Sequence, residues 1–247
     1  PLEYYFNNLN SLMNLLTCMR EFKVPNLVFS SSCTVYGQAD VLPVTEKTPR
    51  HEAESPYGNT KVMSEDIIRD LMRVEPDMKA LALRYFNPIG AHPTAFIGEL
   101  PNGVPNNLIP YLTQTAIGIR EQLSVFGDDY NTPDGSPLRD YIDVVDLAQA
   151  HVVAIRRLLD GKNKKNYEFF NIGTGKALSV LEIIHAFERA TGVKVNYKVV
   201  GRRAGDIEKV WADTTLANNE LGWKAVTPIE ETLANAWKWQ KSLEATN

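Results

Sequence analysis

Helix and strand patterns alternate along the first third of the chain, and this alternation limits the chain to few architectures. One short strand is expected to begin with the apolar run 27–29, and a second is expected at 79–87. An amphipathic helix is expected between them, at 55–75. Helices that alternate with short buried strands are typical of right-handed crossovers in a parallel sheet. The sequence therefore predicts an α/β fold, a doubly wound parallel sheet with helices on both faces. A first helix is expected at 1–22, with an apolar stripe of Phe6, Leu9, Met13, Leu16 and Met19.

The chain changes character after residue 88, where Gly and Pro residues indicate an irregular segment that leads into a second lobe. Ser179 is expected to cap a later helix and Gly192 to end it. The helices predicted beyond residue 88 lie near 106–118, 143–159, 179–192 and 228–243, and the strands at 167–173 and 193–200.

Composition excludes several classes of protein. The chain has 247 residues, of which 44% are hydrophobic and 23% charged, as in an ordinary globular protein. Its formal charge of -4 provides no basic field for general binding of nucleic acid, and no apolar run reaches the length of a membrane span. The two cysteines and four histidines lack the spacing of a disulfide framework or a metal site. We expect a cytoplasmic protein that binds no metal, nucleic acid or membrane.

Tyr57 and Lys61 lie four residues apart, just after a plausible helix start at Ser55 and Pro56. Residues at this spacing share a helix face, and a nearby cation lowers the pKa of a phenol, so the pair could serve proton transfer. The alternative is a surface helix on which the ring packs against the Lys stem. Polar strand ends, Ser30 to Ser32 and Tyr85 to Asn87, favour the first interpretation, because ligands of parallel sheets bind at the carboxyl ends of the strands.

Eight short motifs occur in order and at fitting distances along the chain. Through them the sequence resembles the extended short-chain dehydrogenase/reductase superfamily, and within it the UDP-glucose 4-epimerase family. The resemblance runs essentially from end to end. The motifs are FSSSCTVYG, SPYGNTK, LRYFNPIGAH, IPYL, LRDYIDVVDLAQAH, FFNIGTG, GRRAGD and LGW.

The resemblance implies an NAD-dependent isomerase that interconverts UDP-galactose and UDP-glucose through a transient 4-keto sugar. Tyr57 would be the general base at the sugar's 4-hydroxyl, and Ser32 would bind the same oxygen and relay the proton. Lys61 would bind the nicotinamide ribose and hold the pKa of Tyr57 low. The cofactor-binding residues implied in this way are Ser30, Tyr57, Lys61 and Tyr85.

The resemblance also implies a binding site for the UDP-sugar. A helix start at Asn106 and Asn107 would face the diphosphate, and Arg139, Arg203 and Asp206 would hold phosphate and ribose, which suits these residue types. The alternatives are a plain turn and cap for the Asn pair, and a surface ion pair for Arg203 and Asp206. The full set implied for the substrate is Ser32, Cys33, Thr34, Tyr85, Phe86, Asn87, Asn106, Asn107, Leu108, Ser124, Val125, Phe126, Arg139, Arg203, Asp206 and Val210.

One expected motif of the superfamily, the G-x-G-x-x-G coenzyme fingerprint, does not occur in these 247 residues. The chain opens at Pro1 directly in a helical pattern, so we expect a fragment, with the fingerprint strand before Pro1 or supplied by another chain. We expect two domains. The first is the truncated remainder of a Rossmann NAD-binding domain, formed by residues 1–88 together with residues 136–172. The second is a smaller α/β lobe that binds the nucleotide sugar, formed by residues 89–135 and 173–247. The helices near 1–22 and 55–75 are candidates for a homodimer face, although their apolar residues could equally be core.

Several functions remain open beside 4-epimerisation of UDP-glucose. Sugar-nucleotide 4,6-dehydratases and decarboxylases carry an acidic pair just after the strand-end Ser/Thr, where this chain has Cys33, Thr34 and Val35. UDP-glucuronate 4-epimerases share the Tyr and Lys, and a non-catalytic sugar-nucleotide-binding protein is the alternative outside enzymes. Val210 falls at the position where such epimerases place a residue that borders the sugar pocket. A small side chain there leaves room for an N-acetyl group, which predicts that UDP-N-acetylhexosamines are also accepted.

Overall fold

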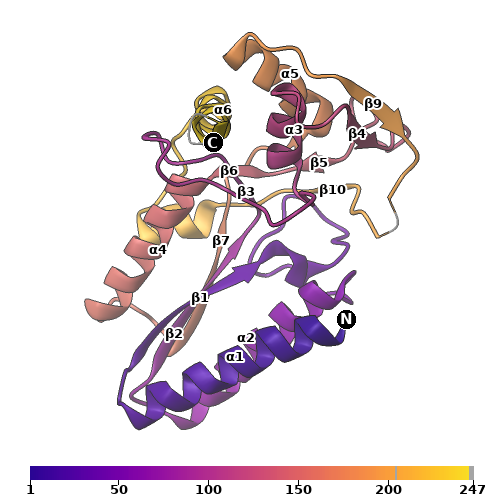
Figure 1. Ribbon diagram of the computed structural model, residues 1–247. Coiled ribbons are helices and arrows are strands. Elements are labelled where there is room, and N and C mark those ends of the chain that lie inside the picture. Colours follow the sequence, from indigo (N-terminus) through magenta and orange to yellow (C-terminus); the bar gives the residue numbers. More distant parts are fainter. Residues whose placement is uncertain (204, 245–247) are drawn as a thin grey trace. The chain divides into compact units, whose positions relative to one another are not determined.

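The computed structural model describes residues 1–203 and 205–244, and these form two compact units (Figure 1). Unit 1 consists of residues 1–86, 149–172 and 212–224. Unit 2 consists of residues 87–148, 173–211 and the C-terminal stretch from residue 225. The expected division differs from this one at two places, because residues 136–148 lie in unit 2 and residues 212–224 in unit 1. Ala204 of the GRRAGD motif and the last three residues of the expected second lobe lie outside the described residues.

Unit 1 is built on a three-stranded parallel sheet with the order β1-β2-β7, as the alternation of patterns predicts. The strands are β1 (Asn26–Ser32), β2 (Lys79–Tyr85) and β7 (Tyr167–Ile172). Their register pairs Ser32 with Tyr85, and Tyr85 with Ile172, so the three strands end at one edge. The polar residues that follow the apolar parts of β1 and β2 therefore lie side by side.

Helices cover both faces of this sheet (Figure 1). On one face α1 (Leu2–Glu21) packs against α2 (Pro56–Val74), and on the other lies α4 (Val144–Leu159), which belongs to unit 1 from Gln149 onward. A short 3₁₀ helix, η1 (Cys33–Tyr36), follows β1, and the π-helical turn η2 (Ala217–Leu221) completes the unit. The core between α1, α2 and the sheet contains Leu12, Leu16, Met19, Leu27, Ile68, Met72, Met78 and Ala80.

The predicted apolar stripe of α1 is only partly correct. Leu16 and Met19 are buried as expected, but Phe6 is 65% exposed and Met13 is 45% exposed, while Leu12 takes a core position. The reason is angular: Leu12, Leu16 and Met19 share one helix face, and Phe6 and Met13 share the neighbouring face. α1 therefore has a second apolar face that the rest of the described chain leaves in contact with solvent.

Unit 2 contains three small sheets. β3 (Asn87–Ile89) pairs with β6 (Tyr141–Asp143), and β4 (Leu123–Phe126) with β9 (Tyr197–Val200), both in parallel. The third sheet has the order β10-β5-β8, formed by β10 (Lys209–Val210), β5 (Leu138–Arg139) and β8 (Leu178–Ser179). The irregular segment expected after residue 88 is present, since the next helix begins only at Leu108.

Three helices pack on these sheets, namely α3 (Leu108–Ala116), α5 (Val180–Thr191) and α6 (Ile229–Glu244). Ser179 caps α5 through a capping box with Glu182, and Gly192 ends the helix in the left-handed conformation, as predicted. The core of unit 2 gathers apolar side chains of all three helices and of the sheets, among them Leu112, Val125, Ile183, Ile184, Phe187 and Leu233.

Across 1–203 and 205–244 no helix is both long and apolar enough to cross a membrane. Within the same residues no group of three or more His, Cys, Asp or Glu side chains is arranged to hold a metal ion. Both cysteines are free thiols; Cys18 is exposed and Cys33 is buried.

Candidate active site

Tyr57 and Lys61 lie on one face of the first two turns of α2, as their spacing predicts. The Ser55 hydroxyl caps the helix by accepting the Gly58 N–H at 3.1 Å, and Pro56 occupies the first helical turn. The Lys61 ammonium lies 5.4 Å from the centre of the Tyr57 ring and donates to the Ser30 carbonyl oxygen at 2.8 Å. Helix α2 thereby brings a phenol and an ammonium to the carboxyl end of β1.

The phenol of Tyr57 is half-buried. Burial raises the pKa of Tyr57 to about 12, with a further increase from Tyr85, while the neighbouring Ser32 side chain opposes the rise. Burial thus outweighs any lowering of this pKa by Lys61 in the described chain, and the effect expected of Lys61 stays a prediction. Desolvation dominates, and the pKa of Lys61 is itself lowered by burial.

Ser30 joins three elements at the same edge of the sheet. Its carbonyl oxygen accepts from Lys61, its hydroxyl bonds the Nε2 atom of His151 on α4 at 2.9 Å, and its side chain neighbours Tyr85 of β2. Burial raises the pKa of the Tyr85 phenol. The sequence predicts no role for His151. A hydroxyl-rich strand end facing a His on a later helix is a contact that spacing along the chain does not reveal.

The remaining predicted residues of unit 1 line the same strand ends. Cys33 is buried at the start of η1, and Phe86 is buried directly after β2. The Thr34 hydroxyl oxygen is buried and has no hydrogen-bond partner among residues 1–203 and 205–244. Since a buried polar atom is costly without a partner, this hydroxyl is suited to meet a polar ligand.

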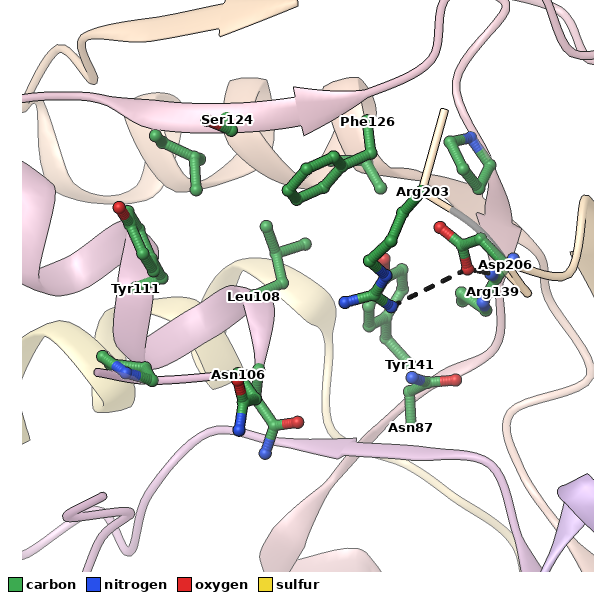
Figure 2. Close-up of a pocket in the computed structure, with 15 residues that line it drawn as sticks. Asn87, Asn106, Leu108, Tyr111, Ser124, Phe126, Arg139, Tyr141, Arg203 and Asp206 are labelled. Carbon is green, nitrogen blue, oxygen red and sulfur yellow. Dashed lines mark hydrogen bonds and ion pairs between the residues drawn. The ribbon is translucent and has the colours of Figure 1, made fainter. Parts of the chain in front are cut away.

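Unit 2 contains a pocket of about 450 Å³, within the range of small-molecule sites (Figure 2). It lies at the N-terminus of α3, beneath β4, with Arg139, Arg203 and Asp206 grouped at one end. Nine of the residues predicted to bind substrate line it: Asn87, Asn106, Asn107, Leu108, Ser124, Phe126, Arg139, Arg203 and Asp206.

The charges in this pocket suit an anion with neighbouring hydroxyls. The Asp206 carboxylate accepts from Arg139 at 2.6 Å, and the Arg203 guanidinium is only loosely paired with it at 3.9 Å. The Arg203 side chain is 57% exposed and lies above the Phe126 ring. Asn107 starts α3 without a side-chain cap, and its amide donates to Glu99 instead, at 2.7 Å. The first N–H groups of α3 therefore face a pocket that also holds two guanidinium groups, an arrangement that binds phosphates.

Val125 and Val210 were also predicted to bind substrate but do not line the pocket, and six of its fifteen lining residues were not predicted. Val125 points from β4 into the core of unit 2, and Val210 is buried beside Arg139 in the β10–β5 pairing. Tyr111 and Tyr141 line the pocket without having been predicted. Their spacing could have found them, because Tyr111 lies one helical turn after Leu108, and Tyr141 lies two residues after Arg139.

Comparison with known proteins agrees with this geometry. Residues 1–236 match the family model described as GDP-mannose 4,6 dehydratase. The UDP-glucose 4-epimerase of Bacillus subtilis (strain 168) is 50% identical over 242 residues, which are 98% of this chain and 70% of that protein. The chain belongs to the UDP-glucose 4-epimerase family.

Solved structures of this epimerase family have the same fold. The epimerase from Stenotrophomonas maltophila, with bound NAD and formylated UDP-arabinopyranose, matches with a TM-score of 0.96 and 46% identity. This match covers 100% of the chain and 72% of that structure. The epimerase from Bifidobacterium longum, in complex with NAD+ and UDP, matches with a TM-score of 0.92 and 45% identity over 98% of the chain and 71% of that structure. The predicted α/β, Rossmann-like architecture is thereby confirmed.

Proposed function

We propose that the protein is an NAD-dependent UDP-glucose 4-epimerase, which interconverts UDP-galactose and UDP-glucose through a transient 4-keto sugar. The observation that carries the proposal is the cluster of Ser32, Tyr57 and Lys61 at the end of β1. There the Tyr57 phenol has the Ser32 side chain as a neighbour and lies one helical turn from an ammonium. A phenol between a hydroxyl and an ammonium is suited to exchange a proton with a sugar hydroxyl.

The residues present in unit 1 fit the nicotinamide end of NAD. An ammonium has three donors, and Lys61 uses one of them on Ser30, so ribose hydroxyls can accept the others. The hydroxyls of Ser30, Tyr85 and Thr34 add polar groups at the same strand ends. Bound NAD would accept the hydride of carbon 4 and return it, and its cationic ring would favour the Tyr57 phenolate.

Each remaining step of the reaction is assigned to a side chain. Tyr57 takes the proton of the 4-hydroxyl as hydride leaves carbon 4, and gives it back when the hydride returns to the opposite face. Ser32, which neighbours the same phenol, holds the sugar oxygen and relays the proton. Lys61 keeps a positive charge beside the phenolate that forms, and its bond to Ser30 fixes its direction. A positioned acid-base group of this kind contributes about 100- to 10,000-fold in rate.

The pocket of unit 2 is assigned to the UDP part of the substrate. Arg203 and the N-terminus of α3 suit the diphosphate, because both offer N–H donors to negative oxygens. Asp206 suits a ribose hydroxyl, and Phe126 and Tyr111 offer aromatic surface to the base. Arg139 binds Asp206 and thereby holds that carboxylate in place.

The competing functions have less support. A 4,6-dehydratase needs an acid directly after the strand-end Ser, and this chain has Cys33, Thr34 and Val35 there, so the elimination lacks its proton donor. UDP-glucuronate 4-epimerases share the Tyr and Lys but are less similar to this chain at its RYFNPIGAH segment. A non-catalytic binding protein would have no use for a phenol, a hydroxyl and an ammonium brought together on one strand end.

Acceptance of UDP-N-acetylgalactosamine and UDP-N-acetylglucosamine is a further part of the proposal. It is supported by the small side chain of Val210, which is buried in the β10–β5 pairing rather than in the pocket wall. Replacement by Tyr would force a ring into this pairing and narrow the space beyond Arg139. We predict that Val210→Tyr lowers turnover of the N-acetylated sugars much more than that of UDP-galactose. If the ratio of turnover of the N-acetylated sugars to turnover of UDP-galactose is the same in the wild type and the variant, this role for Val210 is refuted.

We further propose a homodimer formed through α1 and α2, and a location in the cytoplasm. The dimer is supported by the exposed apolar face of α1, where Leu2 is 70% and Phe6 is 65% exposed, and by Met63 of α2 at 39%. The cytoplasm is supported by the two free thiols, since reducing conditions preserve them.

A coupled assay of the full-length protein tests the proposed function. UDP-galactose should be converted to UDP-glucose, and the purified protein should carry NAD that absorbance and fluorescence detect. Binding of UDP without conversion would favour the non-catalytic alternative. Conversion of UDP-glucuronate in preference to UDP-galactose would favour the other epimerase.

A further inference from the structure

A buried ion pair lies one helical turn beyond Lys61 on α2. Glu65 and Arg84 are 1% and 2% exposed, and they form a bidentate contact, with Arg84 Nε to Glu65 Oε1 at 2.9 Å and Arg84 Nη2 to Glu65 Oε2 at 2.5 Å. The guanidinium also lies 4.0 Å from the centre of the Phe169 ring and donates to the Tyr36 hydroxyl. The proposed proton transfer uses none of these groups.

Burial of such a pair is weak evidence for stability. The cost of removing two charges from water often exceeds their mutual attraction, and apolar replacements of similar volume are frequently neutral or stabilising. A buried ion pair that does not stabilise the fold must therefore have another role, one that apolar side chains would not fulfil. Fixing the position of a neighbouring group is one such role.

The neighbouring group here is Ser31, the central residue of the three serines that end β1. Ser31 is fully buried, and its hydroxyl donates to Glu65 Oε1 at 2.5 Å. The residue before it, Ser30, accepts from the Lys61 ammonium through its carbonyl oxygen, and the residue after it, Ser32, neighbours the Tyr57 phenol. Tyr57, Lys61 and Glu65 follow each other at intervals of four on α2, so each meets one residue of the serine run.

We propose that Glu65 and Ser31 are positioning residues. They fix the end of β1 at the point along α2 where Ser30 meets Lys61 and Ser32 meets Tyr57. Arg84 holds the Glu65 carboxylate in one orientation, because it offers two parallel donors and itself packs against the Tyr36 and Phe169 rings. Without the hydrogen bond from Ser31 to Glu65, β1 and α2 can shift against each other. The Ser30–Lys61 and Ser32–Tyr57 distances then both increase. The inference rests on the proposed function, since it concerns the same catalytic side chains.

The test replaces Ser31 by Ala in the full-length protein, which removes this one bond and leaves the ion pair intact. The matched control is Ser64→Ala, which removes a buried hydroxyl beside Glu65 but keeps the Glu65–Ser31 bond. A displacement of reacting groups by about 1 Å can cost on the order of 100-fold in rate. We therefore expect Ser31→Ala to lower kcat by roughly 10- to 100-fold, with KM for UDP-galactose and binding of UDP nearly unchanged. Ser64→Ala should keep the wild-type kcat.

The outcomes separate this inference from the proposed function. If Ser31→Ala has the same kcat as Ser64→Ala, the positioning role is refuted while the epimerase remains. If Ser31→Ala lowers kcat only in proportion to a loss of folded protein, measured by thermal unfolding, the bond is structural and the inference is again wrong. A wild-type protein without activity would refute the proposed function itself.

Discussion

The chemistry of Tyr57 depends on a balance between burial and its polar neighbours. In the described chain burial prevails and raises the pKa of the phenol to about 12. With this pKa the phenol is protonated at neutral pH in the described chain, although the Lys61 ammonium lies 5.4 Å from the centre of its ring.

Replacement of Tyr57 by Phe removes the hydroxyl and keeps the ring. We predict a loss of about 100- to 10,000-fold in kcat, because the general base is absent. Binding of UDP should be nearly intact, since the pocket of unit 2 is unchanged. Steady-state kinetics and calorimetric titration of UDP measure the two effects, and an unchanged kcat would refute the role of Tyr57.

Glu46 provides a pH-dependent prediction at the same scale. Burial raises the pKa of its carboxyl, although the carboxylate accepts the Asn171 N–H at 2.7 Å. A raised folded-state pKa means that the fold favours the protonated form, so the favourable contribution of Glu46 is complete below its unfolded pKa and is lost as pH rises through the folded pKa. At neutral pH the ionised group therefore destabilises the protein.

Glu46→Gln keeps an oxygen that can accept the Asn171 N–H and removes the charge. The melting temperature should rise at pH 7 by roughly 1–4 °C, as expected for up to about 1 kcal/mol in a protein of this size. The gain should vanish below pH 4, where the wild-type carboxyl is protonated as well. Glu52→Gln, an exposed carboxyl in the same loop, is the control. A gain that is equal at both pH values would contradict the argument.

At the scale of single elements, the sequence predicted helices and strands better than their faces. The caps at Ser55, Ser179 and Gly192 were correct because capping depends on a few local residues. The stripe of α1 was partly wrong because the helix carries two adjacent apolar faces, and periodicity alone does not say which of them meets the sheet. Val125 does not line the pocket because side chains alternate between the faces of β4, whereas the resemblance implied three consecutive residues, Ser124, Val125 and Phe126.

The second apolar face of α1 leads to a prediction about assembly. Leu2, Phe6, Leu9 and Met13 share this face, and an apolar stripe of this kind is typical of a helix that meets another surface. The full-length protein should be a dimer by light scattering, and the double variant Phe6→Glu, Met13→Glu should be a monomer. Phe96→Glu, at an 85% exposed apolar position in unit 2, should remain dimeric. A monomeric wild type would refute the interface.

At the scale of the whole molecule, the two units have separate tasks in the proposed reaction. Unit 1 carries the side chains for proton transfer at the end of a parallel sheet, and unit 2 carries the pocket with the guanidinium groups. The meeting of the Tyr57–Lys61 pair with the end of β1 was predictable, because a strand end and one helix turn are local features. The Glu65–Arg84 pair and the His151 contact join residues far apart in sequence, which a single sequence does not specify.

The central claim is that hydride leaves carbon 4 of the sugar and returns to the same carbon without exchange with solvent. UDP-galactose labelled with deuterium at carbon 4 tests it most directly when the UDP-glucose formed by the full-length protein is analysed by NMR. The account predicts that the product retains deuterium at carbon 4. Replacement of the label by solvent hydrogen would contradict the hydride mechanism and with it the proposed role of the Ser32, Tyr57 and Lys61 cluster.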